Sequence, residues 1–329
     1  MNMTHSYMII THFSRLKNSG KLFLHPQKSE YKMSKIITVA ATQMSCSWNK
    51  EENLQQAEQL VRDAAKAGAQ IILLQELFET PYFCIDIDLD HFSLATEVSK
   101  NPAIQKFSAI AKELDVVIPV SFYELSGPVR YNSIAVIDAT GELLGVYRKT
   151  HIPDTDGYLE KYYFSPGDTG FKVWETKYAK IGIGICWDQW FPEAARDMAL
   201  QGAEILFYPT AIGTEPKQPE LDSMPHWQRV MQGHSAANQV PVIASNRIGL
   251  ETANKSDTNI TFFGSSFITD HTGAKVQEMD KESTGVITHS FDLDEIDFER
   301  RSWGMFRDRV PSAYKRLLTL DGKLGKDHE

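Results

Sequence analysis

The stretch 180–187 constrains the fold of this chain most, because isoleucine and glycine alternate in it and a cysteine follows. Isoleucines separated by small residues are typical of a strand that is covered on both faces. Pro192 and Glu193 then indicate the first turn of a helix. Cys186 therefore stands at the carboxyl end of a buried strand, where open α/β sheets place their chemistry. A cysteine in this place is either a nucleophile or a small buried hydrophobic residue.

Strand and helix signals alternate along the rest of the chain from residue 34 onward. Leucines and alanines at helical spacing, with Gly68 as a stop, predict a helix, and short apolar runs predict strands. The turn 138–141 predicts a hairpin. We find no linker or internal repeat, so we expect one mixed α/β domain with two packed sheets. The expected strands cover residues 36–43, 71–74, 116–123, 132–138, 143–148, 205–208, 240–244, 262–270 and 286–291; the expected helices cover 52–68, 102–114, 193–201 and 225–238.

Composition narrows the class of protein. With 42% apolar residues the chain can build a large core, yet no stretch approaches the ~18 apolar residues that span a membrane. The three cysteines are odd in number and have no Cys-x-x-Cys spacing. This argues against a disulfide framework or a cysteine zinc site, and it favours a reducing compartment.

The net charge of −9 is unevenly spread. Residues 1–32 hold five basic and one acidic side chain, so the remaining chain carries −13. The negative charge of residues 33–329 argues against nucleic-acid binding and is compatible with a cationic substrate. The basic segment is either a targeting signal or an unstructured extension before an alternative start at Met33, and we expect the extension. We then expect residues 33–329 to be the folded domain with a C-terminal tail.

Three charged residues stand where a purely structural element would not place them. Glu76 closes a four-residue apolar run, so it has a partner, faces a cleft or caps the next helix. Arg148 and Lys149 point to opposite faces of a strand, so one of them faces inward if the strand is covered on both sides. An inward Lys149 could stabilise an oxyanion. Alternatively, Lys149 lies on an edge strand and discourages aggregation. Glu160 lies in an aromatic turn segment, either as a pocket acid or as a surface acid paired with Lys161. Together with the cysteine they supply a nucleophile, a base and a cation.

Three motifs resemble the nitrilase, or carbon–nitrogen hydrolase, superfamily, which uses a Glu-Lys-Cys triad. The motifs are Gln75-Glu76-Leu77-Phe78, Tyr147-Arg148-Lys149-Thr150-His151 and Gly184-Ile185-Cys186-Trp187-Asp188. The resemblance covers residues 36 to about 318. It implies an αββα four-layer sandwich, with two mixed sheets flanked by helices, that assembles through its helical faces into homo-oligomers: dimers or larger assemblies such as octamers. It also implies a cytoplasmic enzyme without a cofactor.

The resemblance also implies roles for the site residues. Cys186 would attack the carbonyl carbon, Glu76 would move protons, and Lys149 with the backbone N–H of Trp187 would stabilise the oxyanion. Glu160 matches an additional glutamate that helps to position the lysine and the substrate. Three further stretches, 208–216, 226–239 and 263–268, resemble a branch that hydrolyses a carbamoylated diamine of polyamine biosynthesis through a thioester.

Such a substrate has a cationic far end, which needs an acidic or aromatic seat. Glu215, after the expected strand 205–208, is our main candidate. Asp188 beside the nucleophile is a second candidate, or a structural acid that holds the turn. Aromatic residues could line the aliphatic channel, although aromatic residues in loops are often plain core. These are Tyr82, Phe83, Tyr158 and Trp187.

Several alternatives remain. Carbamoylases of N-carbamoyl-β-alanine or N-carbamoyl amino acids would need a cation for the carboxylate, and Arg247 keeps that option open. Other amidases and nitrilases share the triad. A non-enzymatic oligomerisation module or thiol sensor is a further alternative, but the retention of Glu76 and Lys149 beside Cys186 argues against an idle module, and no resolving cysteine lies nearby in the sequence for a sensor. An α/β-hydrolase is disfavoured because Asp188 replaces the glycine that its tight turn needs. The histidines at 151, 226 and 234 lack metal-ligand spacing, so we expect no metal.

Overall fold

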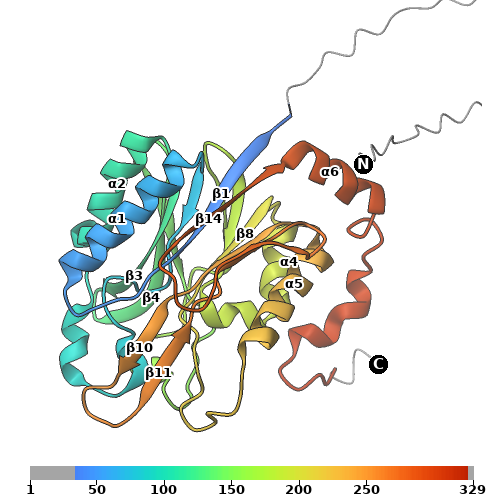
Figure 1. Ribbon diagram of the computed structural model, residues 1–329. Coiled ribbons are helices and arrows are strands. Elements are labelled where there is room, and N and C mark those ends of the chain that lie inside the picture. Colours follow the sequence, from blue (N-terminus) through green and yellow to red (C-terminus); the bar gives the residue numbers. More distant parts are fainter. Residues whose placement is uncertain (1–33, 325–329) are drawn as a thin grey trace, which may run out of the picture. The chain divides into compact units, whose positions relative to one another are not determined.

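The computed structural model describes residues 34–324, which form two stacked β-sheets between two layers of helices (Figure 1). In the first sheet β1 lies between β14, its antiparallel neighbour, and β2, its parallel neighbour. A parallel bridge between Ile71 and Val117 continues this sheet into the antiparallel meander β3-β4-β5. Its strands are β1 (Ile36–Gln43), β2 (Ile71–Leu73), β3 (Ile118–Ser126), β4 (Val129–Ile137), β5 (Leu143–Arg148) and β14 (Gly285–Asp292).

The second sheet has the strand order β13-β12-β9-β8-β7-β6. Its β7, β8 and β9 are mutually parallel, so their carboxyl ends meet at one edge. Gly182 of β7 leaves room for Met198 and Leu206 on the helical side, while the isoleucines face the other sheet. The strands are β6 (Val173–Glu175), β7 (Lys180–Ile183), β8 (Ile205–Pro209), β9 (Val242–Ser245), β12 (Phe267–Thr269) and β13 (Lys275–Glu278).

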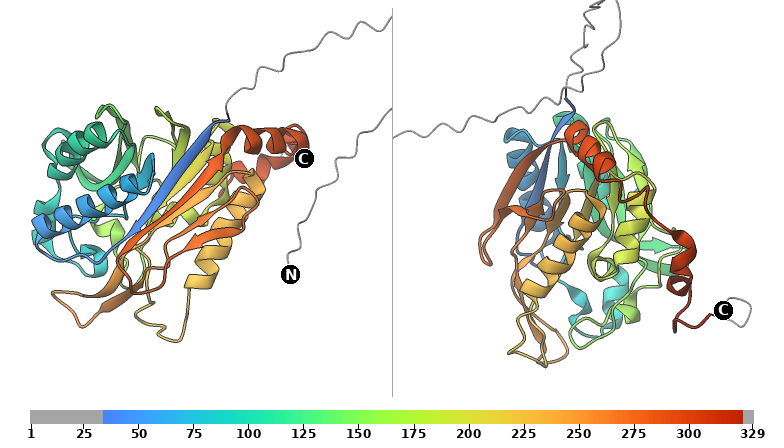
Figure 2. Two further views of the ribbon diagram at one scale, coloured as in Figure 1. Left: turned by 45° about the horizontal axis from the view of Figure 1, so that its top comes forward. Right: turned by 90° about the vertical axis from the view of Figure 1, so that its right-hand side faces the viewer.

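Three apolar layers hold the sandwich together. Side chains such as Val39, Ile183 and Phe207 fill the space between the sheets. On the outer faces, α1 (Lys50–Lys66) and α2 (Pro102–Leu114) pack on the first sheet, and α4 (Pro192–Leu200) and α5 (Met224–Asn238) pack on the second. Figure 2 shows the same arrangement from two further directions. The predicted αββα sandwich is therefore confirmed.

Local chemistry explains where these helices begin and end. The side chain of Asn101 accepts a hydrogen bond of 2.8 Å from the backbone N–H of Ile104, and Pro102 occupies the first helical position of α2. Asp115 ends the same helix in the left-handed conformation, with φ of 56°. Asn49 caps α1 in the same way, because its side chain accepts from the backbone N–H of Glu52 at 3.4 Å. Asparagine caps thus define the N-terminal ends of both helices.

The expected strand 262–270 is wrong as a single element. The backbone breaks at Gly264 and Ser265, which have φ of 52° and 55°. A positive φ cannot continue a strand, so β11 ends at Phe263 and β12 begins at Phe267. The first half pairs with β10 in a separate hairpin, and the second half joins β9. The hairpin strands are β10 (Ile248–Thr252) and β11 (Asn259–Phe263).

The remaining elements lie at the edges of the sandwich. They are the short helix α3 (Glu160–Tyr163), the C-terminal helix α6 (Leu293–Trp303), and 3-10 turns at Phe83–Ile85, Leu89–Leu94, Val98–Lys100, Cys186–Trp190 and Pro311–Leu318. None of the helices within 34–324 combines the length and apolar character that a membrane crossing requires. The prediction for residues 1–32 lies outside the described residues.

The space between the sheets should carry much of the stability. Ile243 of β9 is fully buried there, whereas Ile36 at the start of β1 is 52% exposed. We expect Ile243→Ala to lower the free energy of unfolding by about 2–5 kcal/mol, because it leaves a cavity in the core. The matched change Ile36→Ala should lower it by less than about 1 kcal/mol. Urea unfolding measures both, and equal effects would contradict this account of the core.

Candidate active site

The predicted catalytic residues meet at one end of the sandwich. Glu76 follows β2, Lys149 directly follows β5, and Cys186 follows β7. Glu160 is the first residue of α3, in the loop after β5. Each strand belongs to a sheet whose inner face is packed against the other sheet, so the strand ends are brought together from both sheets. The four side chains therefore form one group although 110 residues separate Glu76 from Cys186.

The backbone around Cys186 forms a sharp elbow. Cys186 has φ of 40°, a value that residues with a side chain seldom adopt and that often marks a functional site. Gly184 allows this approach, because a Cβ there would lie 2.8 Å from the ring of Tyr208. The residue is 6% exposed, and its Sγ lies 3.8 Å from the carbonyl oxygen of Ala211. This contact fixes the direction of the thiol, which lies just beyond the end of β7.

A buried lysine links the two candidate acids. The Nζ of Lys149 lies 2.9 Å from Oε1 of Glu76, and 2.9 and 2.7 Å from the two carboxylate oxygens of Glu160. All three residues are at most 1% exposed. An ammonium group withdrawn from water in this way must be paired, and here it is paired twice. A surface pair with Lys161 would leave Glu160 exposed, and a position at the sheet edge would leave Lys149 exposed. Neither alternative agrees with the burial of these two side chains.

Neutral side chains orient both acids. The Nδ2 of Asn132 donates to Oε1 of Glu76 at 2.7 Å, and the hydroxyl of Tyr82 donates to Oε1 of Glu160 at 2.6 Å. Among residues 34–324, no hydrogen-bond donor reaches the second oxygen of Glu76, Oε2. One oxygen of this carboxylate is therefore held by two donors, while the other is free to accept a proton.

Burial and charge set the protonation of the group. Burial and the charge of Glu76 raise the pKa of Cys186 well above its ordinary value, although Lys149 opposes them. Burial alone would lower the pKa of Lys149, but the charges of Glu160 and Glu76 outweigh it and hold the pKa high. Burial raises the pKa of Glu160 to about 7, against the opposing charge of Lys149. The cysteine is thus a thiol that needs a base, beside a permanent cation.

A cavity of about 210 Å³ opens beside the nucleophile. Three of the residues predicted to contact the substrate line it, namely Tyr158, Trp187 and Glu215. Glu215 is half-buried, and this burial raises the pKa of its carboxyl. A larger outer cavity of about 840 Å³ shares part of its wall with the first. The shared residues are Asp156, Glu215, Pro216 and Lys217.

Three other predicted substrate contacts, Phe83, Tyr82 and Asp188, do not line this cavity, and Phe83 is buried in an apolar cluster. Tyr82 is 1% exposed and does not line this cavity; its hydroxyl orients Glu160 instead. Asp188 is fully buried and does not line the cavity either. Its carboxylate accepts from the N–H groups of Ile185 and His151 and from the hydroxyl of Tyr147. These contacts support the structural role for Asp188, in which it ties the cysteine elbow to the segment that carries the lysine.

Arg247, which kept a carbamoylase alternative open, lies away from the cavity beside Cys186. A carbamoylase of anionic substrates would use it to hold a carboxylate in the pocket. The side chain is instead fully buried, 2.8 Å from Glu251, and lines neither of the two adjoining cavities. The guanidinium also donates to backbone carbonyls of the segment that bears Glu76. Arg247 therefore contacts the protein rather than a bound anion.

The histidines have protein partners. His151 pairs with Asp188 at 2.8 Å, His234 contacts the carbonyl of Gln189 at 2.6 Å, and His226 packs on Trp190. Within the described residues no cluster of three or more His, Cys, Asp or Glu side chains is arranged to hold a metal ion. The three cysteines are free thiols.

The comparisons with known proteins agree with this geometry. Residues 38–301 match the family model of carbon–nitrogen hydrolases. The chain belongs to this family. It is 58% identical to an N-carbamoylputrescine amidase of Oryza sativa subsp. japonica, over 87% of the chain and 96% of the relative. It is 54% identical to a citrullinase of Francisella tularensis, over 86% and 98%. The solved structure of a carbon–nitrogen hydrolase from Helicobacter pylori G27 superposes with a TM-score of 0.81 at 35% identity, over 87% and 99%.

Glu160 should give this hydrolase an acidic limb in its pH profile. Its pKa of about 7 means that kcat/KM should rise with pH through that value, because only the ionised carboxylate holds the ammonium of Lys149. Glu160→Gln should remove the limb and lower kcat/KM by about 100-fold through misplacement of the lysine. The exposed control Glu142→Gln should retain the profile of the unchanged enzyme. A limb that persists in Glu160→Gln would contradict this assignment.

Proposed function

We propose that this enzyme hydrolyses N-carbamoylputrescine to putrescine, carbon dioxide and ammonia through a thioester on Cys186. The observation that carries the proposal is the arrangement of the cavity, in which a half-buried carboxylate, Glu215, lines the same space as the nucleophile. The N-carbamoylputrescine amidases of rice and Arabidopsis thaliana, at 58% and 57% identity, support the substrate. The product would place the enzyme in polyamine biosynthesis.

The first half-reaction forms the thioester. Sγ of Cys186 attacks the ureido carbon while the free Oε2 of Glu76 takes the thiol proton. The oxyanion that develops is stabilised by the ammonium of Lys149 and the backbone N–H of Trp187, and such preorganised donors are worth about 3 kcal/mol each. Collapse breaks the bond to the terminal nitrogen, which leaves as ammonia with the proton from Glu76. An N-substituted carbamoyl group then remains on the sulfur.

The second half-reaction releases the product. Water attacks the carbamoyl carbon while Glu76 accepts a proton from it, and the same two donors stabilise the second oxyanion. Breakage of the carbon–sulfur bond regenerates the thiol, which takes the proton back. The carbamate that leaves loses carbon dioxide and becomes the free amine. Both steps use one base and one oxyanion site, which explains why Glu76 keeps an unoccupied oxygen.

The far end of the substrate is an ammonium group on a short alkyl chain. Glu215 supplies the opposite charge, and within the described residues no cationic side chain pairs with its carboxylate. Tyr158 and Trp187 provide apolar surface for the methylene groups. The raised pKa of Glu215 reflects a desolvated carboxyl that gains stabilisation when a cation arrives.

A second candidate substrate is citrulline, a ureide whose far end carries an ammonium and a carboxylate. The citrullinase of Francisella tularensis supports it, as does Lys217 on the wall of the same cavity. Lys217 is largely exposed and pairs with Asp156 at 2.6 Å. This pair could open to accept a carboxylate, because exposed ion pairs are worth less than about 1 kcal/mol.

Release of ammonia from a panel of substrates decides between these candidates. The panel is N-carbamoylputrescine, citrulline, N-carbamoyl-β-alanine, a simple aliphatic amide and a nitrile, with Cys186→Ala as the control. We expect selective turnover of N-carbamoylputrescine that Cys186→Ala abolishes. Preference for citrulline or the β-alanine ureide would retain the triad and overturn the substrate. No turnover of any compound would support a non-enzymatic module or thiol sensor instead.

Glu215 should act on substrate binding rather than on chemistry. Glu215→Gln removes the charge that meets the ammonium, and such charged contacts are worth about 1.5–3 kcal/mol. We therefore expect KM for N-carbamoylputrescine to rise roughly 10- to 100-fold with kcat nearly unchanged. The exposed Glu220→Gln on the same loop is the matched control. An unchanged KM in Glu215→Gln would place the amine elsewhere.

The family resemblance also implies a cellular compartment and an assembly state for this enzyme. We propose that the enzyme acts in the cytoplasm and as a homo-oligomer, a dimer or larger. Light scattering at several protein concentrations tests the assembly, and localisation of the tagged full-length chain tests the compartment.

A further inference from the structure

The segment 76–82 carries one catalytic acid and supports the other, yet it belongs to no helix or strand. Glu76 lies on it, and Tyr82 at its end orients Glu160. Leu77 adopts φ of 48°, which is unfavourable for a leucine. A backbone of this kind persists only where the surrounding structure holds it in place. Two buried charged side chains hold this segment in place.

Arg247, between β9 and β10, holds the first part of the segment. Its Nη2 donates to the carbonyl oxygens of Glu76 at 2.7 Å and Leu77 at 3.1 Å. Its Nη1 donates to the carbonyl of Thr80 at 3.3 Å. One planar guanidinium thus binds three carbonyls of this irregular segment, and only that of Leu77 also accepts from a backbone N–H within the segment, that of Thr80.

Glu251, on β10, completes the contact. Its Oε1 accepts from Nη1 of Arg247 at 2.8 Å, and its Oε2 accepts from the backbone N–H of Tyr82. The pair therefore spans the segment, with the arginine on the Glu76 side and the glutamate on the Tyr82 side. The guanidinium also lies 5.3 Å from the ring centre of Phe262, which limits its movement. Both side chains are buried, and their opposite charges neutralise each other.

We propose that Arg247 and Glu251 are positioning residues for catalysis, which fix Glu76 for proton transfer and, through Tyr82, fix Glu160 against Lys149. Neither residue touches the substrate cavity beside Cys186, so they act through the backbone. The proposal rests on the proposed function only in that Glu76 serves as the base for the cysteine. The clamp, meaning Arg247 and Glu251 together, is fixed in the fold by the strands β9 and β10.

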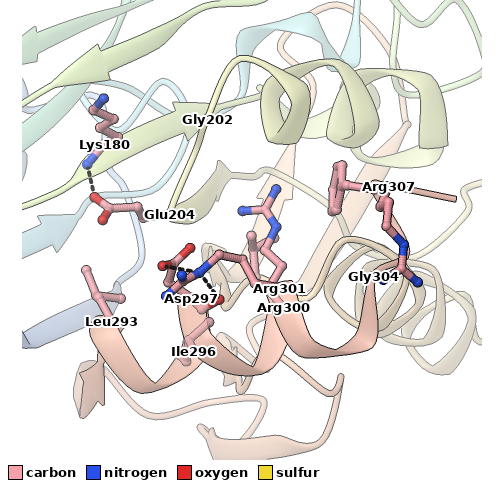
Figure 3. Close-up of a pocket in the computed structure, with 12 residues that line it drawn as sticks. Lys180, Gly202, Glu204, Leu293, Ile296, Asp297, Arg300, Arg301, Gly304 and Arg307 are labelled. Carbon is pink, nitrogen blue, oxygen red and sulfur yellow. Dashed lines mark hydrogen bonds and ion pairs between the residues drawn. The ribbon is translucent and has the colours of Figure 1, made fainter. Parts of the chain in front are cut away.

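The experiment compares four variants of the full chain. Arg247→Met removes the donors but leaves Glu251 buried and unpaired, so it could fail to fold. Arg247→Met combined with Glu251→Gln removes both charges and avoids that problem. Arg247→Lys keeps the charge and part of the hydrogen bonding. The matched control is Arg300→Met on α6 (Figure 3), because Arg300 also donates to two carbonyls, those of Ala199 and Ala203, and does not line the cavity beside Cys186.

Two readouts are needed on variants with native circular dichroism. The first is kcat and KM on the substrate that the panel identifies. The second is the rate at which iodoacetamide alkylates Cys186 as a function of pH, followed on the Cys186 peptide with Cys186→Ala as background. Alkylation requires no substrate, so it tests the clamp even where the proposed substrate is wrong.

We expect the folded variants without the clamp to lose about 100-fold in kcat with KM changed less than about threefold. The alkylation profile should shift to lower pH, since displacement of the Glu76 carboxylate from the thiol removes one of the two effects that raise the pKa of Cys186. Arg247→Lys should reverse part of both changes, and Arg300→Met should lower the melting temperature alone. A folded double variant with normal alkylation would overturn the proposal, as would one that lowers only the melting temperature.

Discussion

The active site depends on one buried cation held between two carboxylates. The ammonium of Lys149 contacts three carboxylate oxygens from Glu76 and Glu160, and almost no solvent reaches the group. Removal of Lys149 would leave two buried carboxylates without their cation, which is strongly unfavourable. The same arrangement keeps the lysine charged and leaves one oxygen of Glu76 free. In the proposed mechanism, this single electrostatic arrangement would supply both the cation for the oxyanion and the base for proton transfer.

The sandwich makes this arrangement possible because it brings strand ends from both sheets to one place. Asp188 links the elbow of Cys186 to the segment that follows β5, and the clamp of Arg247 and Glu251 holds the segment after β2. Gly167 allows the loop after α3 to lie against Lys149, since a Cβ there would lie 2.0 Å from a backbone oxygen. Each catalytic side chain thus has its own support, and all the supports are buried polar contacts.

Local patterns in the sequence predict two packed sheets with charged residues at strand ends, and the resemblance to carbon–nitrogen hydrolases implies the αββα sandwich and the triad. Alternating isoleucines before Cys186 indicate a strand that is covered on both faces. Charged residues at strand ends indicate that the site lies where these strands end. The break at 264–265 was not foreseen, because an apolar run does not reveal a positive φ. The sequence does not predict the clamp either, because Arg247 binds backbone carbonyls and Glu251 binds a backbone N–H that all lie far away in the sequence. Asn132, an asparagine in an apolar strand, is a sequence signal of an additional site residue.

The central claim is that Cys186 forms a covalent carbamoyl intermediate with the ureide. The most direct test is acid quenching of the enzyme during turnover of N-carbamoylputrescine, followed by mass analysis of the Cys186 peptide. The account predicts that this peptide carries the N-substituted carbamoyl group left after loss of ammonia, and that Glu76→Gln prevents its formation. Rapid turnover with an unmodified Cys186 peptide at every quench time would contradict the account.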